Sequence, residues 1–328
     1  MPLNPNTPLP VIVLTGFLGS GKTTLLNRLL SQAPRTAVLI NEFGATPVDQ
    51  VLIGRQDIPL MTLSGGCLCC QVRGALAPVL RNLRLAWENP NSPRFDRIVI
   101  EASGVASPEP ILDTLLRDRW LASRYHLQAV IATVSVPAAE EQLDRFPEAR
   151  AQVAWADVLV LTHTDRASKN HMTHLAARLD ELAPATPRFV AVRGAVDPET
   201  VLAAVAPDNR RLPPGQDLPD HGFRSVSLYL SAPLPWPRLQ TVLEDLLTRH
   251  RSRLVRVKGV VRLSDRTEPV IVQAAMGRLY PPVALPERAS DDRLGRLVFI
   301  AVGAVHELAE ELMAAVGGIA VPDAIRLH

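Results

Sequence analysis

Short apolar runs alternate with longer stretches of helical periodicity over the first two thirds of this chain. The predicted strands are Val11–Thr15, Ala37–Asn41, Arg97–Glu101, Leu127–Val134, Val158–Thr162 and Phe189–Val192. The predicted helices are Lys22–Leu30, Arg73–Trp87, Ile111–Leu116, Lys169–Leu182 and Pro198–Val205. Strands that alternate with helices of this length are typical of βαβ units. We therefore expect the α/β class, with a mostly parallel sheet covered by helices.

The pattern changes after a segment rich in proline and glycine, Pro207 to Gly222, which we interpret as a linker. Beyond it, strands are predicted at Phe223–Leu230, Arg253–Leu263, Pro269–Ala275 and Arg296–Ala301, and helices at Arg238–Arg249 and Glu307–Val316. Neighbouring strands framed by helices indicate a smaller α+β domain with an antiparallel sheet. The predicted organisation is residues 1–206, a linker 207–222, and a second domain 223–328.

Composition limits the binding partners and the cellular compartment but indicates no particular activity. The 328 residues carry 35 Lys and Arg against 33 Asp and Glu, a net charge of +2, so no overall field favours nucleic acid or an anionic membrane. Basic residues at Arg249, Arg251, Arg253, Arg256 and Lys258 are explained by a helix end and a solvated strand face. No segment reads as a signal peptide or a membrane span. We expect a cytoplasmic protein that binds neither nucleic acid nor membrane.

The strongest local signal follows the first predicted strand. The sequence GFLGSGKTT fits the phosphate-loop pattern G-x-x-x-x-G-K-[ST] between a strand and a helix. Backbone amides of such a loop and the helix N-terminus bind phosphate oxygens. The expected nucleotide-binding residues are Gly16, Gly19, Ser20, Gly21, Lys22, Thr23 and Thr24. We expect Lys22 to reach the β- and γ-phosphates and Thr23 to ligate Mg²⁺.

Two carboxylates stand where a nucleotide hydrolase needs them. Glu101 ends an apolar strand, where it can orient Mg²⁺ or the attacking water, and Glu42 follows another strand in a predicted switch segment. Gly104, after Glu101, is predicted to sense the γ-phosphate through its amide. The alternative for each carboxylate is an exposed charge at a strand end. Lys22, Glu101 and Glu42 are the predicted catalytic residues.

The predicted strand Val158–Thr162 leads to a segment that favours guanine. Thr162-His163-Thr164-Asp165 occupies the place of a guanine-reading N-K-x-D. The Asp165 carboxylate can accept hydrogen bonds from guanine N1 and N2, a donor pair that adenine lacks. Thr162 takes the first position, and the His163 ring can stack on a purine. The alternative is a strand followed by an aspartate helix cap.

All three cysteines lie in one short segment. Cys67, Cys69 and Cys70 follow a glycine pair, and thiolates prefer soft or borderline ions such as Zn²⁺ or Cu⁺. Such a loop leaves a fourth ligand position open, which suits a site that releases its ion. A redox pair and buried inert thiols are the alternatives. We predict a metal site, for Zn²⁺ or else Co²⁺.

Taken in order, these motifs resemble the CobW-type P-loop GTPases. The phosphate loop, Asn41–Gly44 with Asp49, Gly65–Cys70 and Glu101–Gly104 carry the resemblance. Arg256–Gly259 and Arg296–Ile300 are similar to that family's C-terminal domain. The resemblance implies a GTPase that delivers a metal to a client metalloenzyme apoprotein. The chain departs from the family pattern at Thr162-His163 and at Ala45, which stands in place of a second glutamate. It also has only His221 at the junction between the two predicted domains.

We expect the switch segment, the thiol loop and Gly104 to lie near the γ-phosphate. GTP with Mg²⁺ would then bring the cysteines together on one ion, and hydrolysis would release it. A P-loop kinase or ATPase acting on a small molecule, with structural cysteines, is the alternative function. A metal-binding module with a vestigial nucleotide fold is another. The sequence leaves a homodimer open.

Overall fold

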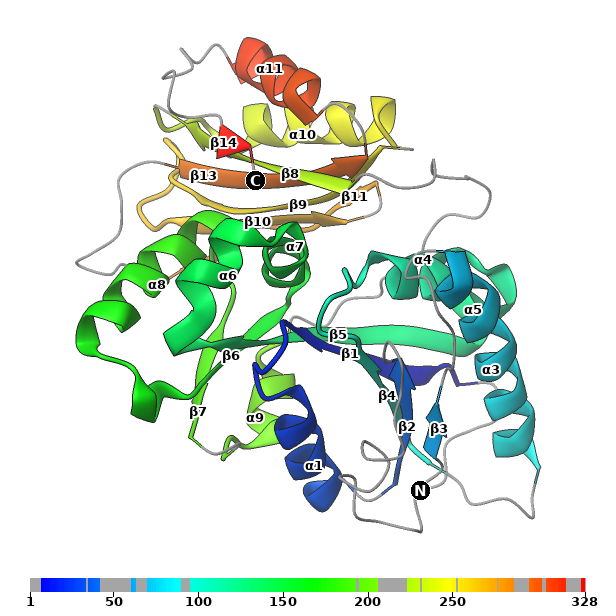
Figure 1. The fold of residues 1–328 in the computed structure, drawn as a ribbon. Helices are drawn as coiled ribbons and strands as arrows, with labels where there is room; N and C mark the ends of the chain where they lie inside the picture. The colour runs from blue at the N-terminus through cyan, green and yellow to red at the C-terminus, as the bar shows by residue number, and fades with distance from the viewer. Residues whose placement is uncertain are drawn as a thin grey trace. The chain divides into compact units, whose positions relative to one another are not determined.

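The structure, a computed structural model, describes residues 7–33, 35–41, 60–62, 70–89, 95–192, 195–205, 223–230, 232–251, 253–275, 277–285, 295–302, 305–316 and 326–327. These residues form two sheets, each with its own helices (Figure 1). The predicted linker, 207–222, lies outside the described residues, so the domain boundaries remain a prediction. Among the described helices, none has the length and apolar character needed to cross a bilayer.

The first sheet is parallel between every described pair of neighbouring strands, in the order β3-β2-β4-β1-β5-β6-β7. Its strands are β1 (Leu9–Gly16), β2 (Thr36–Asn41), β3 (Leu60–Thr62), β4 (Arg97–Ala102), β5 (Tyr125–Ser135), β6 (Val158–Thr162) and β7 (Arg188–Ala191). Both faces of the central strands are buried, which explains their continuous Val, Ile and Leu runs. The predicted parallel sheet is confirmed.

Helices cover both faces of this sheet (Figure 1). The helices in this part of the chain are α1 (Lys22–Gln32), α3 (Cys70–Glu88), α4 (Glu109–Arg117), α5 (Arg119–Arg124), α6 (Ala139–Arg145), α7 (Pro147–Trp155), α8 (Lys169–Leu182) and α9 (Pro198–Ala203), with short 3₁₀ turns η1 (Val136–Ala138) and η2 (Thr164–Arg166). In Figure 1, α1 and α9 lie on one face, and α3, α4, α5 and α7 lie on the other. The sequence patterns did not predict α5, α6 and α7.

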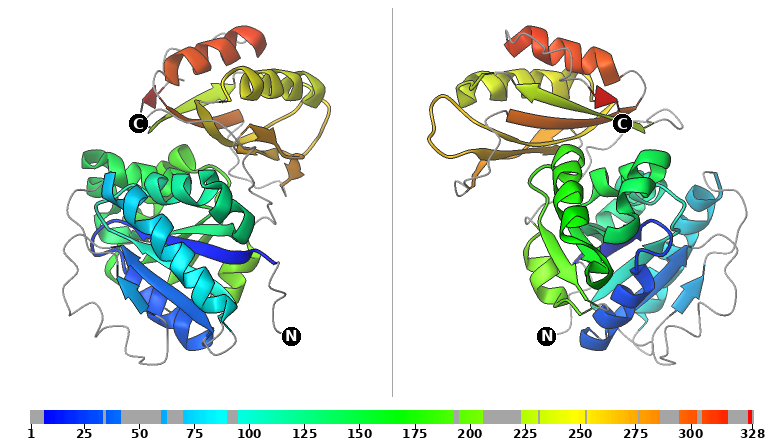
Figure 2. Two further views of the ribbon diagram at one scale, coloured as in Figure 1. Left: turned by 90° about the vertical axis from the view of Figure 1, so that its right-hand side faces the viewer. Right: turned by 60° about the vertical axis from the view of Figure 1, so that its left-hand side comes forward.

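The second sheet is antiparallel, with the path β11-β10-β9-β13-β8-β14 and with β12 pairing to β10. Its strands are β8 (Phe223–Leu230), β9 (Leu254–Val261), β10 (Val270–Ala275), β11 (Arg278–Leu279), β12 (Val283–Ala284), β13 (Gly295–Val302) and β14 (Arg326–Leu327). Helices α10 (Trp236–Arg249) and α11 (Val305–Val316) pack on one face of it (Figure 2). This is the predicted α+β unit, and β11, β12 and β14 were not predicted.

Two basic residues around the end of α10 are paired with carboxylates. Arg249 contacts Asp245 at 2.6 Å and Glu311 at 2.8 Å, and Arg253 contacts Glu307 at 3.2 Å. Exposed pairs of this kind contribute about 0–1 kcal/mol each. Arg249 thus connects α10 to α11, and Arg253, just before β9, also contacts α11.

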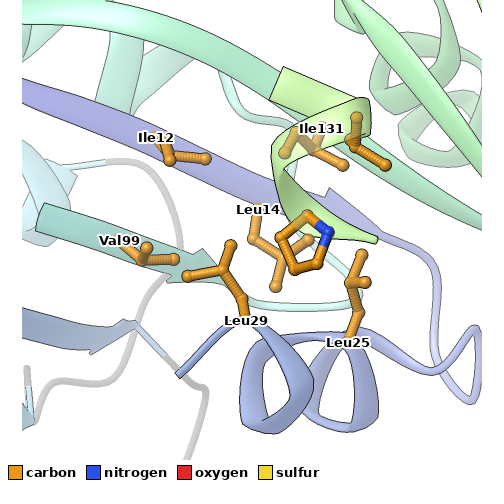
Figure 3. Close-up of a pocket in the computed structure, with 8 residues that line it drawn as sticks. Ile12, Leu14, Leu25, Leu29, Val99 and Ile131 are labelled. Carbon is orange, nitrogen blue, oxygen red and sulfur yellow. The ribbon is translucent and has the colours of Figure 1, made fainter. Parts of the chain in front are cut away.

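A small apolar pocket lies between α1, α9 and the first sheet (Figure 3). It is lined by Ile12, Leu14, Leu25, Leu29, Val99, Ile131, Pro198 and Val201. Its free space of about 10 Å³ has room for roughly one water molecule, but the lining offers almost no polar surface to hold one. We interpret it as a packing gap behind the phosphate loop.

Shortening a side chain at this gap should destabilise the chain. Leu29 is 4% exposed, so Leu29→Ala removes buried methyl groups beside an existing void and should cost about 2–5 kcal/mol of unfolding free energy. Urea unfolding followed by circular dichroism measures the loss. Leu85→Ala is the matched control, since Leu85 is 60% exposed and its loss should stay within about 0.5 kcal/mol. Equal losses in the two variants would contradict this packing.

Candidate nucleotide site

The phosphate loop joins β1 to α1 through backbone conformations that require glycine. Gly16 and Gly21 have φ values of 137° and 91°, which L side chains rarely adopt. A Cβ on Gly16 would also lie 2.3 Å from Thr133 Oγ1 and 2.4 Å from the Thr133 carbonyl oxygen. The loop therefore passes directly against the end of β5, and no larger residue fits at its first position.

Side chains from two neighbouring strands hold the loop in place. The hydroxyls of Ser20 and Thr133 lie 2.6 Å apart, and Ser20 Oγ also donates to the Phe17 carbonyl at 2.7 Å. Thr162, at the end of β6, donates to the Ser20 carbonyl at 2.8 Å. Thr162 was predicted from its position in a guanine-reading motif. Its hydroxyl is bonded to the phosphate loop.

Lys22 is buried inside the loop that it follows. Its Nζ donates to the Gly16 carbonyl at 3.0 Å and to the Phe17 carbonyl at 3.3 Å. Gly19 and Thr24 are exposed on the same loop and the first turn of α1. Because the loop is followed by a helix N-terminus, its amides and the Lys22 ammonium together form an anion-binding arrangement.

Thr23 and Glu101 bring two oxygen ligands together beside the loop. Thr23 Oγ1 donates to Glu101 Oε1 at 2.9 Å, and Glu101 is 1% exposed at the carboxyl end of β4. A hydroxyl and a carboxylate are hard oxygen donors, which suit Mg²⁺. The donor set therefore fits the predicted magnesium ion. Glu42, the other predicted carboxylate, lies outside the described residues.

Gly104 lies against the phosphate loop although it is far away in sequence. A Cβ on Gly104 would stand 3.0 Å from Lys22 Nζ, 3.0 Å from the Leu18 amide nitrogen and 2.8 Å from Leu18 Cδ2. The structure thus brings the loop, Lys22, Thr23, Glu101 and Gly104 to one edge of the sheet. This is the edge formed by the carboxyl ends of β1 and β4, where open parallel sheets bind ligands.

The segment after β6 presents His163 and Asp165 near this edge. His163 has a left-handed backbone with φ 53°, and its Nδ1 lies 2.9 Å from the Ser135 hydroxyl. Asp165 lies in η2 and is exposed. The His163 ring is therefore tied to the end of β5, while the Asp165 carboxylate faces solvent and is open to a ligand.

The predicted thiol site falls mostly outside the described residues. Cys67 and Cys69 lie in the segment 63–69, and Cys70 is the first residue of α3. Among the residues that the structure describes, no group of three or more His, Cys, Asp or Glu side chains is arranged to hold a metal ion. The thiol metal site remains a prediction from the sequence.

Sequence reasoning missed the residues that fix these loops from the side. Thr133 contacts both Ser20 and the site of a Gly16 Cβ, and Gln152 of α7 donates to the Gly104 carbonyl at 3.2 Å. The Phe17 and Phe146 rings lie 4.6 Å apart between centroids. Each contact joins residues far apart in sequence, so no local spacing could have revealed it. Only Thr133, a polar residue within the apolar run Ala129–Val134, was a visible signal.

Glu109 is a buried carboxyl beside the Gly104 segment. It is 5% exposed at the start of α4, and Trp155 Nε1 donates to its Oε1 at 2.7 Å. Its Oε2 is buried and has no hydrogen-bond partner within the described part of the chain. Burial, opposed in part by hydrogen bonds and assisted by the nearby Glu148 charge, raises the pKa of Glu109 to about 7.

Glu109 should make stability fall as pH rises. Below pH 4.5 the carboxyl is protonated in both states, whereas between pH 4.5 and about 7 only the unfolded chain loses this proton. This group should therefore remove up to about 3 kcal/mol of unfolding free energy across that window, levelling off above it. Glu109→Gln should flatten that part of the profile in urea unfolding from pH 4 to 8. Glu141→Gln, at a side chain 68% exposed, should leave the profile unchanged. A slope that persists in Glu109→Gln would refute the assignment.

Two family models match the chain. Residues 10–190 match the family described as CobW/HypB/UreG, nucleotide-binding domain, and residues 223–316 match the cobalamin synthesis protein cobW C-terminal domain. The first match covers the strands and loops of the site above, and the second covers the antiparallel sheet from β8 to β13 with its two helices.

Individual proteins agree with these matches. The zinc chaperone YjiA of Escherichia coli is 33% identical over 83% of this chain and 87% of its own length. The zinc chaperone CobW of Pseudomonas aeruginosa is 27% identical over 92% of this chain and 89% of its own. The crystal structure of zinc-bound YjiA GTPase from E. coli shares the fold, with a TM-score of 0.54, 23% identity, and coverage of 94% of this chain and 99% of that chain. With its phosphate loop and both domain matches, this chain belongs to the CobW family of P-loop GTPases.

Proposed function

We propose that this chain is a GTP-hydrolysing zinc chaperone that carries Zn²⁺ on Cys67, Cys69 and Cys70 and delivers it to a client metalloenzyme apoprotein. The names of its relatives support the class, since YjiA and the Pseudomonas CobW protein are both zinc chaperones. Co²⁺ accepts the same thiolate ligands, and metal supply decides between the two ions.

The observation that carries the proposal is the position of the thiol segment's two ends. The segment begins after Thr62, at the carboxyl end of β3, and ends where α3 begins at Cys70. Thr62 and Glu101 both pair with Ile40 of β2, one from each side. Strands lie about 4.8 Å apart, so the thiol segment leaves the sheet roughly 10 Å from Glu101. The predicted switch segment leaves β2 between them, after Asn41.

In the hydrolysis that we propose, water attacks the γ-phosphorus of GTP and the bond to the β–γ bridging oxygen breaks, giving GDP and phosphate. Lys22 would leave the Gly16 and Phe17 carbonyls and bind β- and γ-phosphate oxygens. Glu101 would hold Mg²⁺ together with Thr23 or orient the water, directly or with Glu42. Thr23 would hold Mg²⁺, which when bound neutralises phosphate charge. The Gly104 amide would bind the γ-phosphate and so distinguish GTP from GDP.

Zinc affinity should depend on the bound nucleotide. A zinc titration of the reduced protein against a chromophoric chelator, with Mg²⁺–GTP analogue, with Mg²⁺–GDP and without nucleotide, measures this dependence. A coupling of about 1–3 kcal/mol corresponds to roughly 5- to 150-fold tighter zinc with the analogue. Cys67→Ala and Cys69→Ala should each abolish this tight one-to-one binding. Zinc binding that ignores the nucleotide, or that is absent throughout, would favour a P-loop kinase or ATPase with structural cysteines.

Asp165 should set the preference for guanine. Because hydrogen bonds to a charged group contribute about 1.5–3 kcal/mol, Asp165→Ala should weaken GDP binding by roughly 10- to 150-fold. ADP binding should not change, since adenine lacks the donor pair that the carboxylate accepts. Isothermal titration of both nucleotides checks this, with ADP as the internal control. Equal weakening of GDP and ADP would show that Asp165 has a structural role only.

A further inference from the structure

One stretch of chain, from Gln142 to Trp155, contacts both loops that surround the phosphate site. Gln142 Nε2 donates to the Leu18 carbonyl at 3.4 Å, and the Phe146 ring packs on Phe17 with centroids 4.6 Å apart. Further along, α7 reaches the Gly104 segment through Gln152 and Trp155. The four residues that make these contacts from the stretch 142–155 belong neither to the phosphate loop nor to the predicted catalytic set.

Gln152 makes the most specific of these contacts. Its side chain is 1% exposed, and Nε2 donates to the Gly104 carbonyl at 3.2 Å and to the Ala106 carbonyl at 2.8 Å. Since carbonyls only accept hydrogen bonds, the amide orientation is fixed with the nitrogen toward this segment. Its Oε1 is buried and has no hydrogen-bond partner within the described residues. Leaving a buried acceptor unsatisfied is costly, which indicates that the two donated bonds matter.

These bonds fix the backbone around Gly104. The Ala106 amide donates to the Ser103 carbonyl at 3.1 Å, which closes a tight turn over Ser103–Ala106. This bond orients the peptide plane that carries the Gly104 N–H, because the Ser103 carbonyl and that N–H point in opposite directions. Gln152 fixes the next peptide plane by donating to the Gly104 carbonyl, and a later peptide plane by donating to the Ala106 carbonyl. The turn is therefore held by α7 and cannot rotate by itself.

The other end of the segment that starts at Gly104, at Glu109, is also bonded to α7. Trp155 donates to Glu109 Oε1 at 2.7 Å, and Trp155 lies three residues after Gln152, on one side of α7. Residues 104 and 109 are thus both bonded to α7. Gly104 in turn lies against Leu18 and Lys22 of the phosphate site.

We propose that Gln152 is a positioning residue for the GTP-bound state: it holds the Gly104 turn so that the Gly104 amide meets the γ-phosphate. This inference rests on the proposed role of Gly104. A donor that is already oriented loses little freedom when the phosphate binds, so its hydrogen bond contributes more to affinity. GDP has no γ-phosphate and gains nothing from this orientation. Gln152 therefore raises the affinity for GTP over GDP without touching the nucleotide.

The test compares the dissociation constants of Mg²⁺–GDP and a Mg²⁺-bound non-hydrolysable GTP analogue, measured by isothermal titration. Gln152→Met keeps the length and removes the donor, so the analogue should bind at least about 10-fold more weakly while GDP stays within about 2-fold. The kcat for GTP should fall in parallel. Gln152→Leu also removes the donor without adding a charge, should give the same selective loss, and serves in place of Gln152→Met if the latter does not fold.

The control for a purely structural effect is Val153→Ala on the same helix. Val153 is 3% exposed in the core, so this variant loosens α7 without removing a bond to the Gly104 segment. It should leave the ratio of the two dissociation constants unchanged. If the Gln152 variants weaken GDP and the analogue equally, or change neither, the positioning role is wrong.

Gly104→Ala separates this inference from the proposed function. Its Cβ would meet Leu18 and Lys22, so it should weaken the GTP analogue more than GDP. A selective loss in Gly104→Ala with none in the Gln152 variants would overturn the role of Gln152 and leave that of Gly104 standing. An unchanged ratio in Gly104→Ala would overturn the role of Gly104, and with it this inference.

Discussion

The phosphate loop is held in shape by polar side chains at the ends of the strands around it, and the rest of the site depends on these contacts. Thr133 of β5 and Thr162 of β6 both bond to Ser20, and Glu101 of β4 accepts from Thr23. A parallel sheet brings these strand ends to one edge, although the bonded residues are separated by 78 to 142 positions in sequence. The apolar strands thus fix the register of the sheet. One polar residue at the end of each of these strands then holds the phosphate loop by a hydrogen bond.

The electrostatics of the site suit a ligand that carries more charge than the groups it displaces. Lys22 is 6% exposed and bonds to two neutral carbonyls of its own loop. Charge-assisted hydrogen bonds to phosphate are roughly twice as strong as bonds between neutral groups. A phosphate oxygen is therefore a stronger acceptor for the Lys22 ammonium than either of these carbonyls. The bonds of Ser20 to Thr133 and Thr162 hold the loop in this shape from within the chain, and a loop held in this way costs less to order when an anion binds.

The sequence predicted those features that depend on local pattern. Buried strands such as Val158–Thr162 and the glycine-rich loop before Lys22 carry their signal in a few consecutive residues. Helix α7 was missed because its apolar and polar residues are not sorted onto two faces; Gln152 and Trp155 are buried beside Val153. Within the described ranges strand β3 pairs with β2 alone, and its three residues are too short to show a period. The bonds of Gln152 to Gly104 and Ala106 span 46 to 48 positions, so the fold alone reveals them.

The sheet edge also limits how a zinc site on the thiol loop could respond to GTP. Between Glu101 and Thr62 lies β2, whose Val38–Ile40 are buried and paired on both sides, so a shift of the strands would break backbone hydrogen bonds and core packing. Any coupling must therefore pass through the segments that leave the edge after Asn41, Thr62 and Ala102. Linkage then requires reciprocity. If GTP raises the zinc affinity by some factor, zinc raises the GTP affinity by the same factor relative to the zinc-free protein. A carrier built in this way favours GTP when zinc is plentiful, and a client that withdraws the zinc weakens the hold on GTP by the same factor.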